Sequence, residues 1–514
     1  MLDVLVIGAG PAGVQAAYYL RKAGVLFELI ERSSTPGSFF ETFPRHRKLI
    51  SINKKHTGSD DPEFNLRHDW NSLLCDDDLR FTEFDDALFP QADKFLLYIA
   101  EFVEANKIEI SYGSEVRCID AENGVFTAHL TNGRVIQARR VIVATGFARS
   151  RVPSIEGIEH AIDYGDMSID PMDFVNQRVL VIGKGNSAFE TADHLAGSAA
   201  LLHLVSPSPL RMAWNTHYVG NLRAVNNNIL DMYQLKSQHA ILDAKIISIT
   251  KSVAGLDVTF AYSHAQGEVE TISYDKILTC AGFMLDASIF APSCAPARAY
   301  EGKFPLLTNS YESINVPGMY FAGTLTHSLD YRKGTSGFIH GFRYNVKALV
   351  SIICHRALGR PIEPIADSDI ETFGRCILGR VNVVSSIWQQ PAVLAEFFRF
   401  DDERYQHYEA LPVEYGVEDY FAKDKVVALT FEYGSHMSGD IFNQSRIARD
   451  NLGQASDSQF LHPVLRYYDC GVLRGEHHVI EDLEAKWTCS EHLEGIDQFL
   501  ARVTDAQVDE MQGV

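Results

Sequence analysis

The chain has 514 residues, of which 46% are hydrophobic and 22% are charged, and its formal net charge is −21. This length exceeds what one ordinary hydrophobic core supports, so we expect two to four domains. The acidic balance argues against a nucleic acid or an anionic membrane surface as a partner, and favours a small-molecule substrate.

The eight cysteines are scattered, without a C-x-x-C pair or the spacing of metal ligands. We therefore expect no disulfide framework and no metal. No stretch reaches the roughly 18 apolar residues of a membrane span, and the first strand begins at Leu2, which leaves no room for a cleavable signal. These observations predict a cytoplasmic protein.

The first predicted strand, 4–7, is apolar throughout and leads into a glycine-rich turn. That turn reads Gly8-Ala9-Gly10-Pro11-Ala12-Gly13. A buried strand, a tight turn and a helix in this order place backbone N–H groups around a pyrophosphate. A helix over 14–23 and a second strand, 27–31, follow. The second strand ends at Glu31, which we expect to bind a ribose hydroxyl, with its neighbour Arg32 also contacting the cofactor.

The same pattern recurs about 175 residues later, after the apolar strand 179–182. Here the turn reads Gly183-Lys184-Gly185-Asn186-Ser187-Ala188. Two such turns predict two dinucleotides held by one polypeptide. The strand after the second turn, 201–205, ends at Ser206 rather than at an acid, and Arg211 lies five residues on. An arginine without a nearby carboxylate favours NADPH over NADH, although Arg211 as an ordinary surface residue is the alternative.

The organisation between and after these turns predicts a discontinuous first domain. A strand ending in Ala144-Thr145-Gly146 precedes the second unit, a similar strand ends it at 277–282, and the chain returns through 318–324, which includes Gly323. We also expect a helix over 92–107, a hairpin over 125–135 and a helix from about Gly337 to Ala357.

The predicted fold class is α/β, with two Rossmann-like domains, the second inserted in the first, and a C-terminal α+β extension. The predicted boundaries are 1–150 with 281–360, 151–280, and 361–514.

This arrangement resembles class B flavin monooxygenases and related flavoprotein reductases over about residues 1–360. The resemblance implies FAD in the first domain and NADPH in the second. It also implies that Asn53, in the segment 48–55, faces the reacting edge of the flavin as a catalytic residue. Longer strings are similar to the FAD-dependent oxidoreductase domain-containing family, of which this chain would be a soluble relative. They are 43–53, 216–220 (Thr-His217-Tyr-Val-Gly), 231–236 and 337–344.

Some positions depart from the patterns of these families. The motif that identifies the monooxygenases is incomplete around His160. Gly323-Thr324 stands where the reductases have Gly-Asp, so Asp330 becomes a candidate contact to the flavin ribityl chain. The resemblance places the N-terminus of the helix at Gly337 beside the flavin, where it would stabilise negative charge. We expect Thr335 and Ser336 to cap this helix.

A basic run, 45–48, precedes Asn53, and we expect its Arg47 to contact the cofactor or the substrate. The alternative is a basic loop that only pairs with nearby acidic side chains. Residues 361–514 carry 28 acidic and 12 basic side chains and no defensible catalytic spacing. This region is predicted to be a substrate cover or the surface of a homo-oligomer.

The resemblance implies an NADPH-dependent monooxygenase that reduces FAD, forms a C4a-hydroperoxyflavin with O2 and oxygenates a small nucleophile, with N-hydroxylation as the preferred reaction. Two alternatives remain open: a reductase that passes electrons to a quinone, thiol or protein, and a non-catalytic flavoprotein that acts as a binding module.

Overall fold

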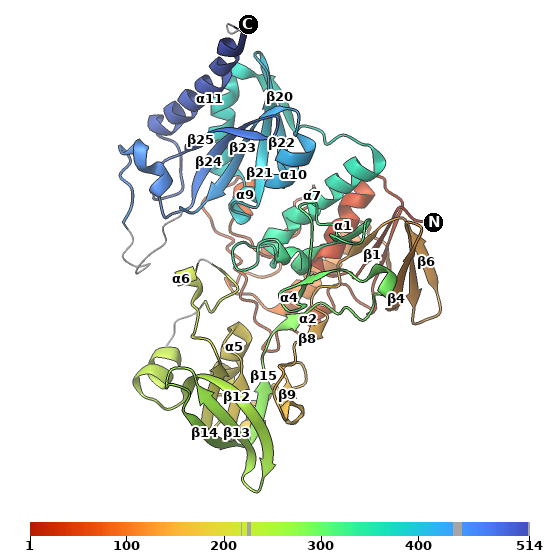
Figure 1. The fold of residues 1–514 in the computed structure, drawn as a ribbon, viewed down its shortest axis with the longest axis vertical. Coiled ribbons are helices and arrows are strands. Elements are labelled where there is room, and N and C mark those ends of the chain that lie inside the picture. The colour runs from red at the N-terminus through yellow and green to blue at the C-terminus, as the bar shows by residue number, and fades with distance from the viewer. Residues whose placement is uncertain (217, 224–227, 435–444, 512–514) are drawn as a thin grey trace.

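The computed structural model describes residues 1–216, 218–223, 228–434 and 445–511. Figure 1 shows three bodies, each built on its own sheet: one around β1 and α1, one around β10 to β15 below it, and one around β20 to β25 above it.

The first sheet is parallel and has the order β19-β7-β1-β2-β3. Its central strands are apolar and almost fully buried, as expected for a parallel sheet covered on both faces. Its strands are β1 (Val4–Ile7), β2 (Phe27–Ile30), β3 (Ile110–Ser111), β7 (Val141–Val143) and β19 (Met319–Phe321). Because β19 comes from far along the chain, the sheet is assembled from two separate stretches of sequence.

Three long helices belong to this body. They are α1 (Pro11–Lys22), α4 (Ala92–Ala105) and α7 (Ile339–Leu358). Helix α1 begins three residues before the predicted start because Pro11 supplies a first helical position that needs no N–H donor. Helix α7 ends at Gly359, which adopts the left-handed conformation typical of a helix C-terminus. The predicted hairpin is present as β5 (Val125–Leu130) and β6 (Val135–Ala138), which form a small antiparallel sheet with β4 (Val116–Glu122).

The second sheet has the order β14-β13-β12-β11-β10-β15-β9. Strands β10, β11 and β15 are parallel to one another, and β12 to β14 continue as an antiparallel meander. The bounds are β9 (Ile162–Asp163), β10 (Arg178–Ile182), β11 (Leu201–Ser206), β12 (Ala240–Ser252), β13 (Gly255–Tyr262), β14 (Val269–Tyr274) and β15 (Lys276–Thr279), with helix α5 (Asn186–Leu195) after β10. The short pair β8 (Arg149–Ser150) and β16 (Phe283–Met284) joins the two ends of this unit to the first body.

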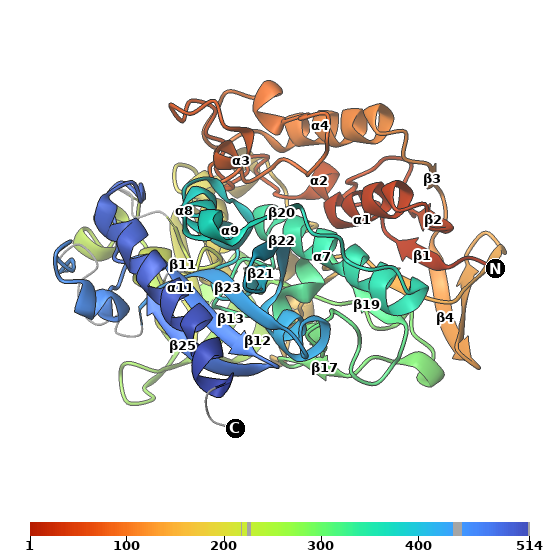
Figure 2. The ribbon, with the colours of Figure 1, turned by 90° about the horizontal axis from the view of Figure 1, so that it is seen from above.

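The C-terminal region contains a six-stranded antiparallel sheet of order β20-β22-β21-β23-β24-β25. Its elements are β20 (Ala366–Asp369), α8 (Phe373–Val383), α9 (Ser386–Gln389), β21 (Leu394–Phe400), β22 (Arg404–Pro412), β23 (Lys425–Glu432), β24 (His462–Asp469), β25 (Val472–His478) and α11 (Ser490–Met511). Side chains of α8 and α11 cover one face of the sheet, and side chains from its other face join the core around α1 and α7. Figure 2 shows α11 lying across this sheet.

These observations confirm the predicted fold class: two Rossmann-like units with a C-terminal α+β region. Within the described ranges, no helix combines the length and apolar character that a membrane crossing requires.

Candidate functional site

A cavity of about 550 Å³ opens at the carboxyl ends of the first parallel sheet. This position is where open α/β sheets bind ligands, and the volume lies within the range of cofactor pockets. Predicted residues that line it are Gly8, Gly10, Pro11, Ala12, Glu31, Arg32, Ala144, Thr145, Gly146, Gly323 and Gly337.

The first glycine-rich turn has the geometry that its sequence predicts. Gly8 has a φ of +99°, and a Cβ there would lie 2.8 Å from the carbonyl oxygen of Ala144. A Cβ on Gly13 would lie 1.8 Å from the carbonyl oxygen of Gly8, whereas Gly10 has open space beside it. Gly13 therefore serves the packing of helix on strand, and Gly10 leaves room for a ligand to approach the backbone.

The carboxylate of Glu31 closes the turn from the end of β2. Its Oε2 accepts a hydrogen bond from the Ala9 N–H at 2.7 Å, and its Oε1 accepts bonds from the Ser33 N–H at 2.9 Å and the Ser38 hydroxyl at 3.2 Å. Glu31 is buried and lines the cavity. It thus holds the turn itself, and a ribose hydroxyl would be a further donor to it.

Three buried polar atoms in the cavity wall have no hydrogen-bond partner: Thr145 Oγ1, Thr324 Oγ1 and Asn71 Oδ1. Native proteins rarely leave such atoms unsatisfied, so each needs an explanation. A flavin and its ribityl chain carry the donors and acceptors that would satisfy them. The residues present therefore fit FAD.

The beginning of α7 forms another wall, through Gly337, Phe338, Ile339 and Phe342. Gly337 packs against the His327 ring, 3.0 Å from where its Cβ would be. The expectation that Thr335 and Ser336 cap this helix is wrong. The capping position is occupied by Phe338, which makes no side-chain capping bond. The side chains of Thr335 and Ser336 are bonded to the C-terminal region instead.

Four residues predicted to contact the flavin or its substrate do not line the cavity: Gly13, which packs α1 on β1, and Arg47, Asn53 and Asp330. Asn53 is buried and donates its amide N–H to the carbonyl oxygen of Asp85 at 2.6 Å. Arg47 forms an ion pair with Asp93 at 2.5 Å. Asp330 accepts bonds from His327 Nδ1 at 2.8 Å and from the Ser336 N–H at 3.0 Å. Their contacts with cofactor stay predictions.

The basic run joins the first unit to the second. The Arg45 guanidinium donates to the Met167 carbonyl at 2.5 Å, and His46 Nε2 lies 3.2 Å from the Thr191 hydroxyl on α5. Two members of the basic run, Arg45 and His46, therefore face the second unit rather than the cavity.

The second glycine-rich turn repeats the first. Gly183 has a φ of +138°, and a Cβ there would lie 2.3 Å from the carbonyl oxygen of Cys280. Gly185 has open space beside it, as Gly10 has, and it precedes α5. The third position tolerates Ala188, which is fully buried.

The predicted contacts around this turn have partners within the second unit. The Asn186 amide donates to the carbonyl oxygen of Asn221 at 3.0 Å, and burial raises the pKa of the Tyr164 hydroxyl to about 12, while the Ser187 side chain acts to lower it. Arg211 is exposed near the end of β11. Lys184 is nearly buried and forms an ion pair with Asp243, a contact that the sequence did not predict.

A hydrogen-bonded chain crosses from the second unit to the first. The Tyr218 hydroxyl lies 2.9 Å from His327 Nε2, and His327 Nδ1 lies 2.8 Å from Asp330 Oδ1. Burial raises the pKa of Tyr218. Tyr218 belongs to one of the strings that carried the family resemblance; its neighbour His217 lies outside the described residues. The sequence could not reveal this hydrogen-bonded chain, because Tyr218 and His327 are 109 residues apart.

A fully buried histidine lies beside the same junction. Neither ring nitrogen of His340 has a hydrogen-bond partner. Its ring stacks on Trp70 at 4.2 Å between centroids and on Phe338 at 5.8 Å, and the Arg223 guanidinium lies over Trp70 at 5.4 Å. Burial, with Arg343 and Arg223, lowers the pKa of His340, so the imidazole is neutral at pH 7.

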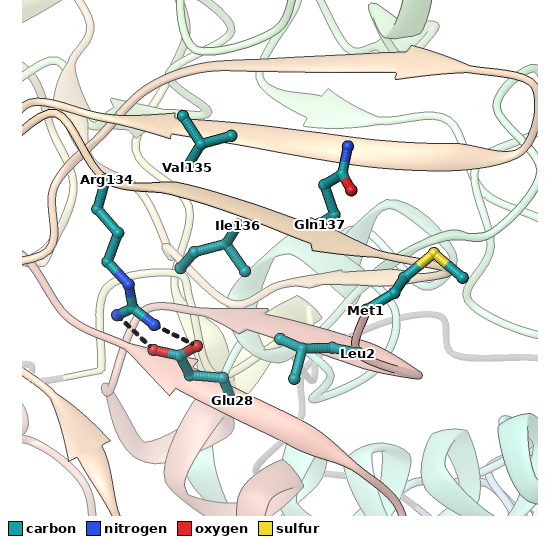
Figure 3. A pocket seen from close by; sticks show the side chains of 7 residues that line it. All are labelled: Met1, Leu2, Glu28, Arg134, Val135, Ile136 and Gln137. Carbon is teal, nitrogen blue, oxygen red and sulfur yellow. Dashed lines mark hydrogen bonds and ion pairs between the residues drawn. The ribbon is translucent and has the colours of Figure 1, made fainter.

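A second, shallower pocket lies at the edge of the first body, away from both turns (Figure 3). It is lined by Met1, Leu2, Glu28, Arg134, Val135, Ile136 and Gln137. The Arg134 guanidinium donates two hydrogen bonds to Glu28, at 2.7 and 2.8 Å. The charges of Arg134 and Glu28 therefore satisfy each other.

Comparison with known proteins places this geometry among flavoproteins. The family profile described as pyridine nucleotide-disulphide oxidoreductase matches residues 5–323. The FAD-dependent oxidoreductase domain-containing protein 2 of Mus musculus is 36% identical over 98% of this chain and 84% of its own length. The bacillithiol disulfide reductase Bdr of Staphylococcus aureus superposes with a TM-score of 0.54 at 20% identity, over 69% of this chain and 99% of its own. A flavin monooxygenase from Stenotrophomonas maltophilia does so with a TM-score of 0.53 at 18% identity, over 68% and 98%. The two solved structures share the fold.

Proposed function

Because the chain belongs to the FAD-dependent oxidoreductase domain-containing family, within the pyridine nucleotide-disulphide oxidoreductases, and is therefore a flavin oxidoreductase, we propose that it is an NADPH-dependent monooxygenase. The observation that carries the proposal is the pair of glycine-rich turns in one chain, the first of which opens into a cavity of about 550 Å³. We further propose that 1–150 with 281–360 bind FAD and that 151–280 bind NADPH.

When bound, FAD supplies two-electron chemistry, accepting hydride and passing electrons to O2. The overall reaction balances as NADPH, H⁺, O2 and a nucleophile giving NADP⁺, water and the oxygenated nucleophile. Gly10 and the start of α1 would hold the FAD pyrophosphate, Glu31 would bind its ribose, and Gly337 with the start of α7 would face its ring system. Gly185 and the start of α5 would hold the NADPH pyrophosphate, with Arg211 toward the 2′-phosphate.

The substrate would lie at the junction of the two units beside Phe338, which lines the cavity, with the buried His340 ring stacked behind it. If Phe338 moved aside, the neutral imidazole of His340, whose two nitrogens have no partner, would accept a hydrogen bond from an uncharged amine and donate one in return. Apolar rings on either side would exclude water from the nucleophile. These contacts support a small amine as the substrate class.

The lining of the cavity gives no support for an electron relay through two cysteine thiols of this protein. None of the described residues that line it is a cysteine. Cys280 lies behind the second turn, where burial raises the pKa of its thiol to about 12 and so disfavours the reactive thiolate. The family profile favours a second candidate, a reductase that passes electrons directly from flavin to an external acceptor.

Oxygen labelling tests the proposal and separates it from this alternative. The FAD-loaded protein is supplied with NADPH and ¹⁸O2 and a panel of small amines, and NADPH oxidation, hydrogen peroxide and labelled products are measured together. The proposal expects one ¹⁸O atom in the product for each NADPH oxidised. Stoichiometric peroxide with every amine, or reduction of a quinone or disulfide without O2 consumption, would contradict it and favour the reductase.

A further inference from the structure

The C-terminal region reaches back to the flavin cavity through one fully buried side chain, Gln390. Its Nε2 donates to Ser336 Oγ at 3.0 Å and to Asn345 Oδ1 at 2.8 Å. Its Oε1 accepts bonds from the backbone N–H of Thr335, at 3.3 Å, and from the Thr335 hydroxyl, at 2.9 Å. All four polar positions of this amide contact the turn before α7 or α7 itself.

The turn held by Gln390 immediately precedes residues of the cavity wall. Ser336 is followed by Gly337, Phe338 and Ile339, which line the cavity. From the other side, the Ser336 N–H is held by Asp330 Oδ2 at 3.0 Å. The turn before α7 is therefore held by Asp330 from the first body and, from the C-terminal region, by the Gln390 side chain together with the Gln389 carbonyl.

The segment before Gln390 holds a second part of the wall. The Arg67 guanidinium donates to the carbonyl oxygens of Val384, at 2.9 Å, and Val381, at 2.8 Å, and it lies over the Trp388 ring at 4.5 Å. The Gln389 side chain donates to the Arg67 carbonyl at 2.6 Å. These contacts fix the loop that carries Trp70 and the cavity-lining Asn71. Helix α9 lies beside α7 in both views (Figures 1 and 2).

We infer that residues 381–390 are an integral part of the flavin site, and that Gln390 is a positioning residue for the N-terminal turn of α7. The inference rests on FAD occupying the cavity, as the proposed function also requires, but it does not depend on what accepts the electrons.

The physical consequence concerns the charge of the flavin. The N-terminus of a helix carries about half a positive charge, and its effect falls off within the first turn. An α7 that is held against the flavin would stabilise the anionic reduced form over the neutral oxidised form. Loosening the turn would lower that preference and make the midpoint potential of the bound FAD more negative. A tenfold loss in the preference corresponds to about 30 mV for a two-electron couple.

The test is the midpoint potential of bound FAD, measured by equilibration with a reference dye and without NADPH or O2. Gln390→Leu is expected to lower the potential by about 30 mV, the tenfold loss above. Ile496→Val, a buried change in α11, controls for loss of stability, and Gln498→Leu, an exposed change in the same helix, controls for the substitution itself; neither is expected to move the potential.

An unchanged potential in folded Gln390→Leu protein would overturn the inference. If that variant does not fold, Thr335→Val removes the hydroxyl bonded to Gln389 and Gln390 and must lower the potential in the same direction. A shifted potential in a protein that oxygenates no amine would refute the monooxygenase proposal alone. Labelled product together with an unshifted potential would refute the positioning role alone.

Discussion

The two glycine-rich turns have nearly the same backbone but different surroundings. In both, the first glycine has a positive φ and lies against a carbonyl of the neighbouring strand, and the second has open space beside it. The first turn is closed by Glu31 and bordered by unsatisfied polar atoms in a cavity. In the second, β11 ends at Ser206, and Lys184 of the turn forms an ion pair with Asp243. In the proposed function, the turn itself would bind a pyrophosphate, and the end of the following strand would determine which dinucleotide is bound.

The largest contrast is at the third position of each turn. Gly13→Ala would place a Cβ 1.8 Å from the Gly8 carbonyl oxygen, so α1 must move away from β1 at a cost of at least about 3 kcal/mol. We expect the variant to be purified without FAD and to unfold at a lower temperature. The matched change in the second turn, Ala188→Gly, is expected to cost only about 1 kcal/mol and to leave the FAD content unchanged. Equal FAD content in both variants, measured by absorbance, would show that the first turn does not need its glycine.

The next contrast lies two residues further along each helix, where Gln15 in α1 corresponds to Glu190 in α5. Gln15 is buried, and both ends of its amide bind Leu74. Burial raises the pKa of Glu190 from 4.5 to about 7, while Arg223 opposes the shift. The folded state therefore binds this proton more tightly, and the group's contribution to stability falls as pH rises from about 4.5 to 7.

Glu190→Gln removes this ionisation. We expect the variant to match the native protein near pH 4.5 and to be more stable by up to about 3 kcal/mol above pH 7. Urea unfolding of the apoprotein at both pH values measures the difference. A stability gain that does not change with pH would contradict the assignment.

A third contrast compares the ends of β2 and β11. Glu31→Gln keeps an acceptor for the Ala9 N–H but removes the charge, and charge-assisted hydrogen bonds are about twice as strong as neutral ones. We expect FAD to bind roughly tenfold more weakly, a loss of about 1.4 kcal/mol. Isothermal titration of the apoprotein with FAD measures this loss. If Glu31→Gln leaves FAD affinity unchanged, the carboxylate only holds the turn through its hydrogen bonds and does not contribute to FAD binding.

An effect of similar size should come from giving the second strand the acid of the first. Ser206→Asp would repel the 2′-phosphate of NADPH, so we expect KM for NADPH to rise roughly tenfold and KM for NADH to stay the same. Arg211→Gln should act in the same direction. If both variants change the two KM values equally, the 2′-phosphate is recognised elsewhere.

The parts of the site that follow local rules could be predicted from the sequence. Local sequence patterns mark both turns, the strands before them, Glu31 and the small residues 144–146: an apolar run, a fixed glycine spacing, an acid at the end of the second strand and small residues after a buried strand. The groups that bring separate segments together could not be predicted. Tyr218 meets His327, Arg67 meets Val384 and Gln390 meets Ser336 across long stretches of chain, and no local pattern encodes these pairings.

The catalytic role that the resemblance gives Asn53 stays a prediction. Its amide N–H groups donate to the carbonyl oxygens of Asp85 and Ala87, and its buried Oδ1 has no hydrogen-bond partner. Asn71, which the sequence did not single out, lines the cavity with an unpartnered oxygen. The C-terminal region was expected to be a cover or an oligomer surface, and the structure shows it packed against α7 and the loop at 66–72.

The central claim is that one chain holds two dinucleotides so that electrons pass between them. Anaerobic titration of the FAD-loaded protein with NADPH tests this claim most directly, by following the absorbance of oxidised flavin near 450 nm. The account predicts that about one equivalent of NADPH removes this band, and that Gly185→Ala, which fills the open space where the NADPH pyrophosphate would approach the second turn, slows the change without affecting the FAD content. A band that dithionite removes and NADPH does not would contradict it.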